Sequence, residues 1–173
     1  VGLIACQWAR HIGVNLIGTA STDEKCTLAE SYGAKKCVLS GAQNLAETLK
    51  ALAPAGGFPV IYDSVGKDTY HLGLEVLAPL GTFASFGNAS GAIEAISPQD
   101  LAAKGSLSFT RPTLATYMSI PGWLQQSSAK VLQLVEDGVL SVEINQRYGL
   151  DEVRRVHEDL EARATTGCSI ITP

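Results

Sequence analysis

The chain has 173 residues, a hydrophobic content of 46%, a charged content of 17% and a formal net charge of −4. This length suffices for one well-buried domain, or for one domain with an appendage, and the composition is that of a packed protein rather than a disordered one. The negative net charge gives no electrostatic reason to expect a nucleic-acid partner. No apolar run approaches the roughly 18 residues that a membrane-spanning helix needs, so we expect no membrane association.

Helices and strands alternate along the first two thirds of the chain. The pattern starts directly with a helix, and we therefore expect a preceding strand and most of a glycine-rich loop to lie upstream of Val1. Gly13, Gly33 and the Pro54-to-Gly57 segment end helices, and Ser21 or Thr22 caps one. The expected elements are helix 3–12, strand 14–19, helix 23–32, strand 37–39, helix 44–53, strand 58–62, helix 68–77, a turn at 79–81, strand 82–86 and strand 107–110.

Strands separated by helices of this length indicate right-handed crossovers and a parallel sheet covered on both faces. The fold class is therefore α/β, with a Rossmann-type doubly wound parallel sheet. After Pro112 the rhythm changes, and we place a domain boundary near residue 113. The segments expected beyond it are helix 128–137, an extended stretch 142–148, a charged helix 150–163 and a terminal strand 168–171.

Small residues end two neighbouring strands, in Tyr62-Asp63-Ser64-Val65-Gly66 and in Ser85-Phe86-Gly87-Asn88-Ala89-Ser90-Gly91. The carboxyl edge of a parallel sheet is where α/β folds bind ligands. Small residues there let the backbone approach a nicotinamide ribose closely, although ordinary βα turns also use Gly and Asn.

The strand over 14–19 ends in Gly18-Thr19-Ala20-Ser21-Thr22, where NAD-binding domains usually carry an acidic residue for the ribose 2′-hydroxyl. Hydroxyl groups and the ammonium of Lys25 could instead accommodate a 2′-phosphate, which needs donors and a counter-charge. The alternative for Lys25 is a solvated helix lysine. Gly2 precedes the first helix as the last glycine of a phosphate-binding loop would, or is an ordinary glycine.

The sequence shows no G-x-S-x-G elbow, no H-E-x-x-H motif and no paired carboxylates, so we assign no catalytic residue. A nicotinamide cofactor carries its own hydride chemistry. We also expect no metal ligands, because the cysteines show no C-x-x-C pairing and no histidine at zinc-finger spacing. Reduced thiols in a cytoplasmic protein are the expectation for Cys6, Cys26, Cys37 and Cys168. The histidines, His11, His71 and His157, are isolated from one another, and we expect each to be a helix-surface or packing residue rather than a ligand.

Four segments resemble the NADPH:quinone oxidoreductases, the zinc-free, zeta-crystallin-like branch of the medium-chain dehydrogenase/reductase superfamily. These segments are 62–69, 85–91, 103–112 and 160–167, and the resemblance covers the whole chain in order. It implies that the chain is the C-terminal half of a longer protein. Residues 1–113 would then be most of the NADP-binding domain, and residues 114–173 would complete a GroES-like catalytic domain that this chain lacks.

The resemblance also implies roles for individual residues. Gly2 would line the pyrophosphate, and Ser21 and Lys25 would meet the 2′-phosphate. Where many relatives carry Asn-Tyr, this chain has Leu39-Ser40, which puts the strength of the preference for NADPH in doubt. The remaining residues would lie at the ribose (Ser64, Val65), at the nicotinamide (Phe86, Gly87, Asn88), near it (Phe109, Thr110, Arg111) and beside a phosphate (Arg163).

The activity that the resemblance implies is NADPH-dependent reduction of quinones or related α,β-unsaturated carbonyls, with this half alone inactive. One alternative is a zeta-crystallin-like structural or RNA-binding protein that retains NADPH, although the acidic charge argues against RNA. Another is a bare nucleotide-binding sensor. Relatives also suggest a homodimer through the edge strand Leu107–Thr110, which would otherwise expose an apolar edge.

Overall fold

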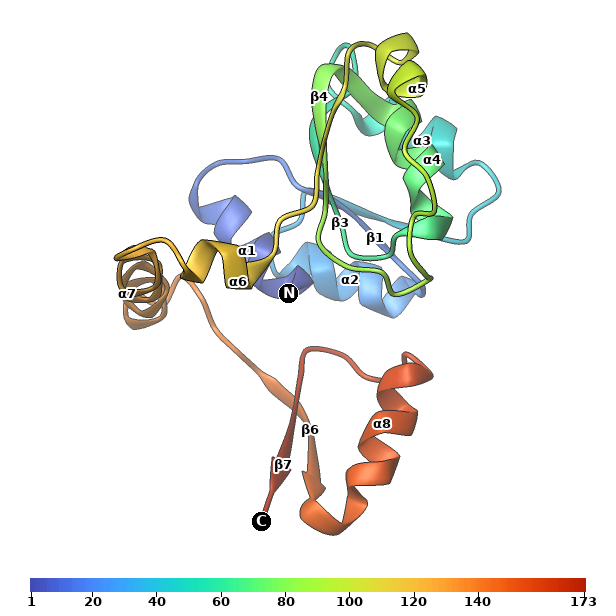
Figure 1. Ribbon diagram of the computed structural model, residues 1–173. Coiled ribbons are helices and arrows are strands. Elements are labelled where there is room, and N and C mark those ends of the chain that lie inside the picture. Colours follow the sequence, from blue (N-terminus) through green and yellow to red (C-terminus); the bar gives the residue numbers. More distant parts are fainter. The chain divides into compact units, whose positions relative to one another are not determined.

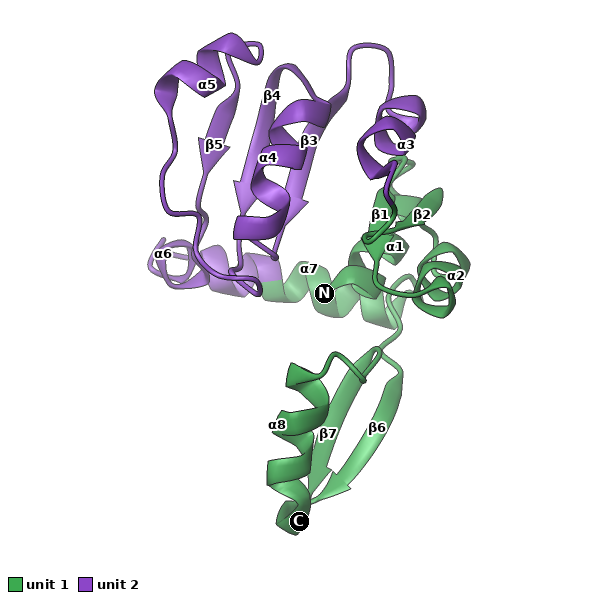
Figure 2. Ribbon diagram, turned by 90° about the vertical axis from the view of Figure 1, so that its right-hand side faces the viewer, with its two compact units in different colours: residues 1–42, 128–173 green, residues 43–127 purple.

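The computed structural model describes residues 1–173, and it divides into two compact units, one of residues 1–42 with 128–173 and one of residues 43–127 (Figure 2). Its strands form three sheets, ordered β1-β2, β3-β4-β5 and β6-β7. Every strand pair in them is parallel. The predicted α/β class with parallel pairing is therefore confirmed. No helix in the structure is both long enough and apolar enough to span a membrane.

The first unit begins with two helices that alternate with two strands. Gly13, with φ of 72°, follows the first helix, and the Thr22 hydroxyl caps the second by accepting a hydrogen bond from the Lys25 backbone N–H. The buried side chains of Cys6, Ala9 and Cys26 lie on these two helices. The elements are α1 (Gly2–His11), β1 (Ile17–Ala20), α2 (Asp23–Ser31) and β2 (Lys36–Leu39) (Figures 1 and 2).

The rest of the first unit comes from the end of the chain. Strands β6 (Ile144–Gly149) and β7 (Cys168–Thr172) pair in parallel, with α8 (Val153–Glu161) packed beside β6. Tyr148 and Val156 are the buried side chains of this layer. A short 3₁₀ turn, η1 (Leu150–Glu152), joins β6 to α8, and the long helix α7 (Trp123–Glu136) begins in the second unit and ends in the first.

The second unit has its own hydrophobic core beneath a three-stranded sheet. Phe83 of the central strand is fully buried, and its ring stacks on Phe109 at 5.7 Å and meets Tyr70 edge-on. Aromatic pairs in these geometries add to the free energy of area burial. The elements are α3 (Leu45–Leu52), β3 (Phe58–Asp63), α4 (Lys67–Val76), β4 (Leu77–Ser85), α5 (Pro98–Ala103), β5 (Ser108–Thr110) and α6 (Leu114–Met118) (Figure 2).

Most expected elements are present within a few residues of their predicted ends, but four details differ. The turn predicted at 79–81 lies inside β4 as an irregularity, because residues 78–81 have no partner between the pairs Phe58–Leu77 and Val60–Thr82, and Leu80 has φ of 64°. Helices α5 and α6 were not expected; they have six and five residues, too few to show a helical period. Helix α7 starts before residue 128, and the charged helix predicted at 150–163 is η1 followed by α8.

The predicted boundary near residue 113 concerns packing against a domain outside this chain. The two compact units of the structure are defined only by packing within this chain, so they do not test that boundary. The boundary therefore stays a prediction.

Candidate functional site

In the first unit, the two predicted serines lie at the same end of the β1-β2 sheet. Ala20 pairs with Leu39 at the carboxyl ends of the two strands, and Ser21 and Ser40 follow directly. The Ser40 backbone N–H donates to the Ala20 carbonyl at 2.8 Å. Both serines are exposed and Thr22 caps α2, so the Ser21 hydroxyl is not used as a helix cap.

Lys25 lies in the first turn of α2 and contacts the residue that follows the last helix. Its ammonium Nζ donates to the backbone carbonyl of Arg163 at 2.6 Å. Arg163 has φ of 57°, a left-handed conformation just beyond the end of α8. The structure thus brings together two of the predicted residues, through the carbonyl of Arg163 rather than through its guanidinium. Because an ammonium has three donors, the Lys25 head group retains N–H bonds for a further acceptor.

Gly2 is the first residue of α1, and its helix end carries no side-chain cap. The residue is exposed, and a Cβ placed on it would meet nothing within 4 Å. The N-terminal N–H groups of α1 are therefore open, but no neighbouring group in the first unit fixes a ligand there.

In the second unit, β3 and β4 end in two loops that lie against one another. Gly87 is packed so closely on Ser64 that a Cβ on Gly87 would lie 2.5 Å from the Ser64 carbonyl oxygen. Gly66, at φ of 94°, opens α4 and also requires glycine. The close approach expected from the small residues at this edge is thus present between the loops themselves.

Backbone hydrogen bonds join the two loops along their length. The N–H of Ala89 donates to the Ser64 carbonyl at 3.1 Å, and the N–H of Ser90 donates to the Val65 carbonyl at 2.8 Å. The Ser90 hydroxyl donates to the same Val65 carbonyl at 2.9 Å. The backbone N–H groups of Gly87 and Asn88 make no hydrogen bond in the structure. This edge therefore offers rigid backbone with two adjacent open donors.

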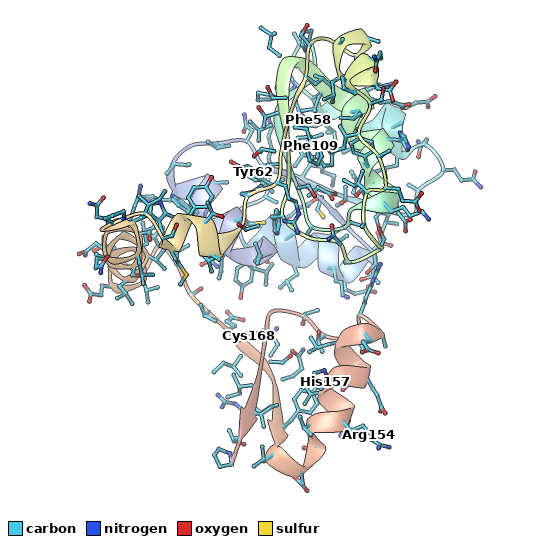
Figure 3. The ribbon with its side chains drawn as sticks, in the orientation of Figure 1. Phe58, Tyr62, Phe109, Arg154, His157 and Cys168 are labelled. Carbon is cyan, nitrogen blue, oxygen red and sulfur yellow. The ribbon has the colours of Figure 1, made fainter.

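The predicted residues of β5 divide into a core residue and two edge residues. Figure 3 shows Phe109 inside the second unit, where its ring packs on Phe83. Its side chain belongs to the core, so only its backbone is available to a ligand. The Arg111 guanidinium donates to the Ser85 carbonyl at 3.1 Å and to the Pro112 carbonyl at 3.3 Å. Arg111 thus ties the exposed end of β5, at Thr110, to the end of β4.

No arrangement of acid, base and nucleophile accompanies these loops. The buried carboxylate at this edge, that of Asp63, already accepts three hydrogen bonds, two from the turn after β3 and one from the Thr69 hydroxyl of α4. His157 and Cys168 come from α8 and β7 of the first unit (Figure 3), and His157 makes no ion pair. The chemistry that these groups allow is binding and orientation of a reactant that carries its own reactivity.

The cysteines do not form a metal site. No group of three or more His, Cys, Asp or Glu side chains is arranged to hold a metal ion. Burial and a hydrogen bond to the Cys26 sulfur raise the pKa of the Cys37 thiol to about 12, and burial raises that of Cys6. A cysteine binds a metal as its thiolate. The buried thiols of Cys6 and Cys37 are therefore poor metal ligands.

Three residues of the second edge were not singled out from the sequence. Asp63, Thr69 and Ser90 hold the loops through side-chain hydrogen bonds. An Asp three positions before a glycine at a strand end is a signal for an Asx turn and could have indicated the role of Asp63. Ser90 carries no local signal, because its partner Val65 is fixed only when the two loops meet. The partners of Thr69, which are Asp63 and Gly66, lie within six residues of it.

Comparison with known proteins supports the resemblance of the chain to oxidoreductases. Residues 1–134 match the family model described as zinc-binding dehydrogenase. A quinone oxidoreductase from Pseudomonas aeruginosa is 45% identical over the whole chain, which covers 53% of that protein. A 2-haloacrylate reductase from a Burkholderia species is 36% identical over the whole chain, which covers 52% of it.

The solved structure of Escherichia coli quinone oxidoreductase complexed with NADPH superimposes with a TM-score of 0.95 at 40% identity. All of this chain and 54% of that one are covered. The chain thus spans about half the length of the relatives it matches.

Proposed function

Because the chain belongs to the zinc-binding dehydrogenase family, we propose that its two loop clusters bind NADPH and that the full-length protein is an NADPH-dependent oxidoreductase. Its substrates are quinones or related α,β-unsaturated carbonyls. The observation that carries the proposal is the group Ser21, Lys25 and Ser40 at the carboxyl ends of β1 and β2, where a carboxylate for a ribose 2′-hydroxyl would otherwise stand.

The first unit supplies the group for the adenosine 2′-phosphate. This dianion needs hydrogen-bond donors and a positive charge. The exposed hydroxyls of Ser21 and Ser40 are donors at adjacent strand ends, and the Lys25 ammonium is held near them by the Arg163 carbonyl. Ser40 is shorter than the tyrosine of many relatives, so Lys25 contributes most of the preference for the phosphate. We assign Gly2 and the Arg163 guanidinium to the other phosphates.

The second unit supplies the surface for the nicotinamide ribose. Its residues are Ser64 and Val65 after β3 and Phe86, Gly87 and Asn88 after β4, with Thr110 and Arg111 at the end of β5. The close packing of Gly87 on Ser64 leaves no room for side chains between the loops. The open N–H groups of Gly87 and Asn88 provide donors without a titrating group.

Hydride is the chemistry that bound NADPH supplies. The residues of this chain hold and orient, and none of them abstracts or delivers a proton in the proposal. Electron-poor double bonds accept hydride, and both quinones and 2-haloacrylates, the substrates in the names of two relatives, contain one. The groups that orient the acceptor belong to residues outside this chain.

The nucleotide preference provides the first test. Titration of the full-length protein with NADPH and NADH, followed by nicotinamide fluorescence, should show NADPH bound about tenfold more tightly, or about 1.4 kcal/mol. Lys25→Ala should remove this gap, and the control Lys35→Ala, an exposed lysine before β2, should keep it. Equal affinity for NADPH and NADH would overturn the proposed 2′-phosphate site. A full-length protein that binds neither nucleotide would overturn the oxidoreductase proposal.

A substrate panel provides the second test. With NADPH bound, 1,4-benzoquinone and a 2-haloacrylate should both be reduced, and a saturated ketone should not. Reduction of the ketone alone would contradict the proposed substrate class.

The quaternary structure and location are part of the same proposal. Strand β5 is at one edge of the β3-β4-β5 sheet, with Ser108 exposed and Leu107 buried. Pairing of this edge with a second copy would satisfy its backbone groups. We expect a homodimer in sedimentation analysis, weakened by Ser108→Lys, and a monomeric wild type overturns it. The four free cysteines are typical of the cytoplasm, where we place the protein.

A further inference from the structure

Asp63 is a buried carboxylate at the end of β3 that is satisfied entirely by its own neighbourhood. It is 7% exposed. Its Oδ1 accepts from the backbone N–H of Val65 at 3.1 Å and of Gly66 at 2.7 Å. Its Oδ2 accepts from the Thr69 hydroxyl at 2.6 Å. No Lys or Arg pairs with it, so hydrogen bonds rather than an ion pair stabilise the buried charge.

These bonds fix the turn that follows β3. The turn has only Ser64, Val65 and Gly66 between the strand and α4. Two of its three N–H groups point at one carboxylate oxygen, and Gly66 is held at φ of 94°. With its donors directed inward to Asp63, the turn presents its carbonyls outward.

The outward carbonyls in turn hold the loop after β4. The carbonyls of Ser64 and Val65 accept the N–H groups of Ala89 and Ser90, and the Ser90 hydroxyl adds a third bond. The same hydroxyl accepts from the Asp68 backbone N–H at 3.1 Å. A displacement of the turn therefore displaces the loop that carries Gly87 and Asn88.

The carboxylate also satisfies the N-terminal end of α4, a helix of ten residues. Oxygen acceptors with negative charge stabilise this end of a helix, and it can otherwise attract an anion. Here the Thr69 hydroxyl in the first turn and the N–H of the cap residue Gly66 are bonded to Asp63. The N–H groups of Lys67 and Asp68 donate to the Gly91 carbonyl and to the Ser90 hydroxyl of the loop after β4. The end of α4 is therefore closed to a phosphate, and the edge beside it suits an uncharged ring.

We propose that Asp63 is a positioning residue for the nicotinamide end of the cofactor, acting through the turn 64–66 and the loop 86–91. This inference rests on the proposed function, because it assumes that these two loops contact the nicotinamide ribose. The new element is that one buried side chain, Asp63, fixes the positions of both loops without contacting a reacting atom. A merely structural role would weaken the binding of the whole cofactor, whereas positioning weakens only its nicotinamide end.

The test compares NADPH with adenosine 2′,5′-bisphosphate, a probe that contains the adenosine 2′-phosphate and lacks the nicotinamide. In the full-length protein, Asp63→Ala should raise the Kd for NADPH about tenfold. The Kd for the probe should stay within about twofold of wild type, since Lys25 and its neighbours are in the other unit. Asp63→Asn keeps the oxygen that accepts from Val65 and Gly66 and should restore most of the NADPH affinity.

Two further variants keep the test decisive if Asp63→Ala does not fold. Thr69→Val removes only the partner of Oδ2 and should weaken NADPH by about threefold, again without affecting the probe. Asp68→Ala is the matched control, because Asp68 is an exposed carboxylate in the same helical turn whose side chain makes no hydrogen bond or ion pair. It should leave both constants unchanged.

The outcomes separate the two levels of the proposal. A wild-type protein that does not bind NADPH overturns the proposed function and this inference with it. If the wild type binds NADPH, equal loss of NADPH and probe in the Asp63 and Thr69 variants shows a structural role and overturns the positioning role alone. Unchanged NADPH affinity in Asp63→Ala overturns it as well.

Discussion

Gln7 and Ser141, which are 134 positions apart, recognise each other through three hydrogen bonds in the first unit. The Gln7 Nε2 donates to the Ser141 carbonyl at 3.0 Å, and its Oε1 accepts from the Ser141 N–H at 2.8 Å and from the hydroxyl at 3.1 Å. Gln7 is 4% exposed. One side-chain amide thus joins α1 to the backbone that leads into β6, within the unit that also contains Lys25 and Arg163.

We expect Gln7→Ala to lower the free energy of unfolding by about 1–3 kcal/mol, because it leaves both polar backbone groups of Ser141 without their partner. Chemical denaturation of the full-length protein measures this. Gln7→Glu should also destabilise, since the carboxylate cannot donate to the Ser141 carbonyl. The control Gln125→Ala changes an exposed glutamine of α7 without a hydrogen bond and should have little effect. A neutral Gln7→Ala would show that the contact contributes nothing.

Removal of one buried hydroxyl should stabilise the second unit. Tyr70 is 3% exposed, and its hydroxyl is buried without a hydrogen-bond partner. Burial of an unpaired hydroxyl costs free energy, while the ring contributes its contacts with Phe83 and Phe109. Tyr70→Phe should therefore raise the free energy of unfolding by up to about 1 kcal/mol.

Replacement of Tyr148 by phenylalanine should instead lower the free energy of unfolding. The Tyr148 hydroxyl donates to Asp159 Oδ2 at 2.9 Å, and this bond raises the pKa of the tyrosine. Tyr148→Phe leaves that carboxylate without its donor, and we expect a loss of about 1 kcal/mol. Thermal unfolding of the two variants in parallel checks the contrast. A shift of the same sign in both would contradict the assignment of the unpaired hydroxyl.

Glu30 should make the free energy of unfolding depend on pH in the acidic range. The Lys36 ammonium, at 2.8 Å, and the Cys37 backbone N–H, at 2.9 Å, hold the pKa of the Glu30 carboxyl below its ordinary 4.5. Because the folded pKa is the lower one, the stabilisation is present above the unfolded pKa and disappears as the pH falls through the folded pKa. Stability should thus fall progressively from about pH 5 downward.

Glu30→Gln should flatten this acid limb in melting temperatures measured as a function of pH. The control Glu158→Gln removes an exposed carboxylate of α8 that has no ion pair and should keep the wild-type slope. An unchanged acid limb in Glu30→Gln would assign the pH dependence to other carboxylates.

The positions of the strand ends could be predicted from the sequence, but the long-range hydrogen bonds that fix the residues around them could not. The strand pattern placed Ser21 at a strand end and the resemblance named Ser40, and the parallel pairing of β1 with β2 brings both to one edge. The bond from Lys25 to the Arg163 carbonyl could not be predicted, since it joins residues 138 positions apart and uses backbone rather than a charged group. The same holds for Gln7, whose partner Ser141 has no signature in its own segment.

Two features of the second unit, an irregular strand and a core ring, depend on packing that the sequence did not show. Pro79 and Gly81 are typical of turns, and they lie in an irregularity of β4 whose residues 78–81 have no partner in β3, while β4 pairs with β3 on both sides of it. The resemblance places Phe109 near the nicotinamide, and alternation along β5 turns its ring into the core beside Phe83, so that its backbone is the part available to a ligand. In both cases tertiary packing, which a short window cannot contain, decides the outcome.

Gly87 should be the least replaceable residue of the proposed nicotinamide end. In Gly87→Ala the new Cβ would lie 2.5 Å from the Ser64 carbonyl oxygen and 2.9 Å from the Ser64 Cα. Both are backbone atoms, and the turn that contains them is fixed by Asp63, so the loop after β4 has to move outward. We expect the Kd for NADPH to rise about tenfold, with adenosine 2′,5′-bisphosphate binding unchanged.

Gly57→Ala is the control because it strains the backbone at the opposite end of β3. Its Cβ would lie 2.6 Å from the Ala78 backbone nitrogen, and its φ of 116° adds strain that Gly87 does not have. It should lower the melting temperature at least as much as Gly87→Ala does, yet leave the ratio of the two dissociation constants at the wild-type value. If both glycine variants change that ratio equally, loss of stability rather than displacement of the loop explains the effect, and the nicotinamide end must be sought elsewhere.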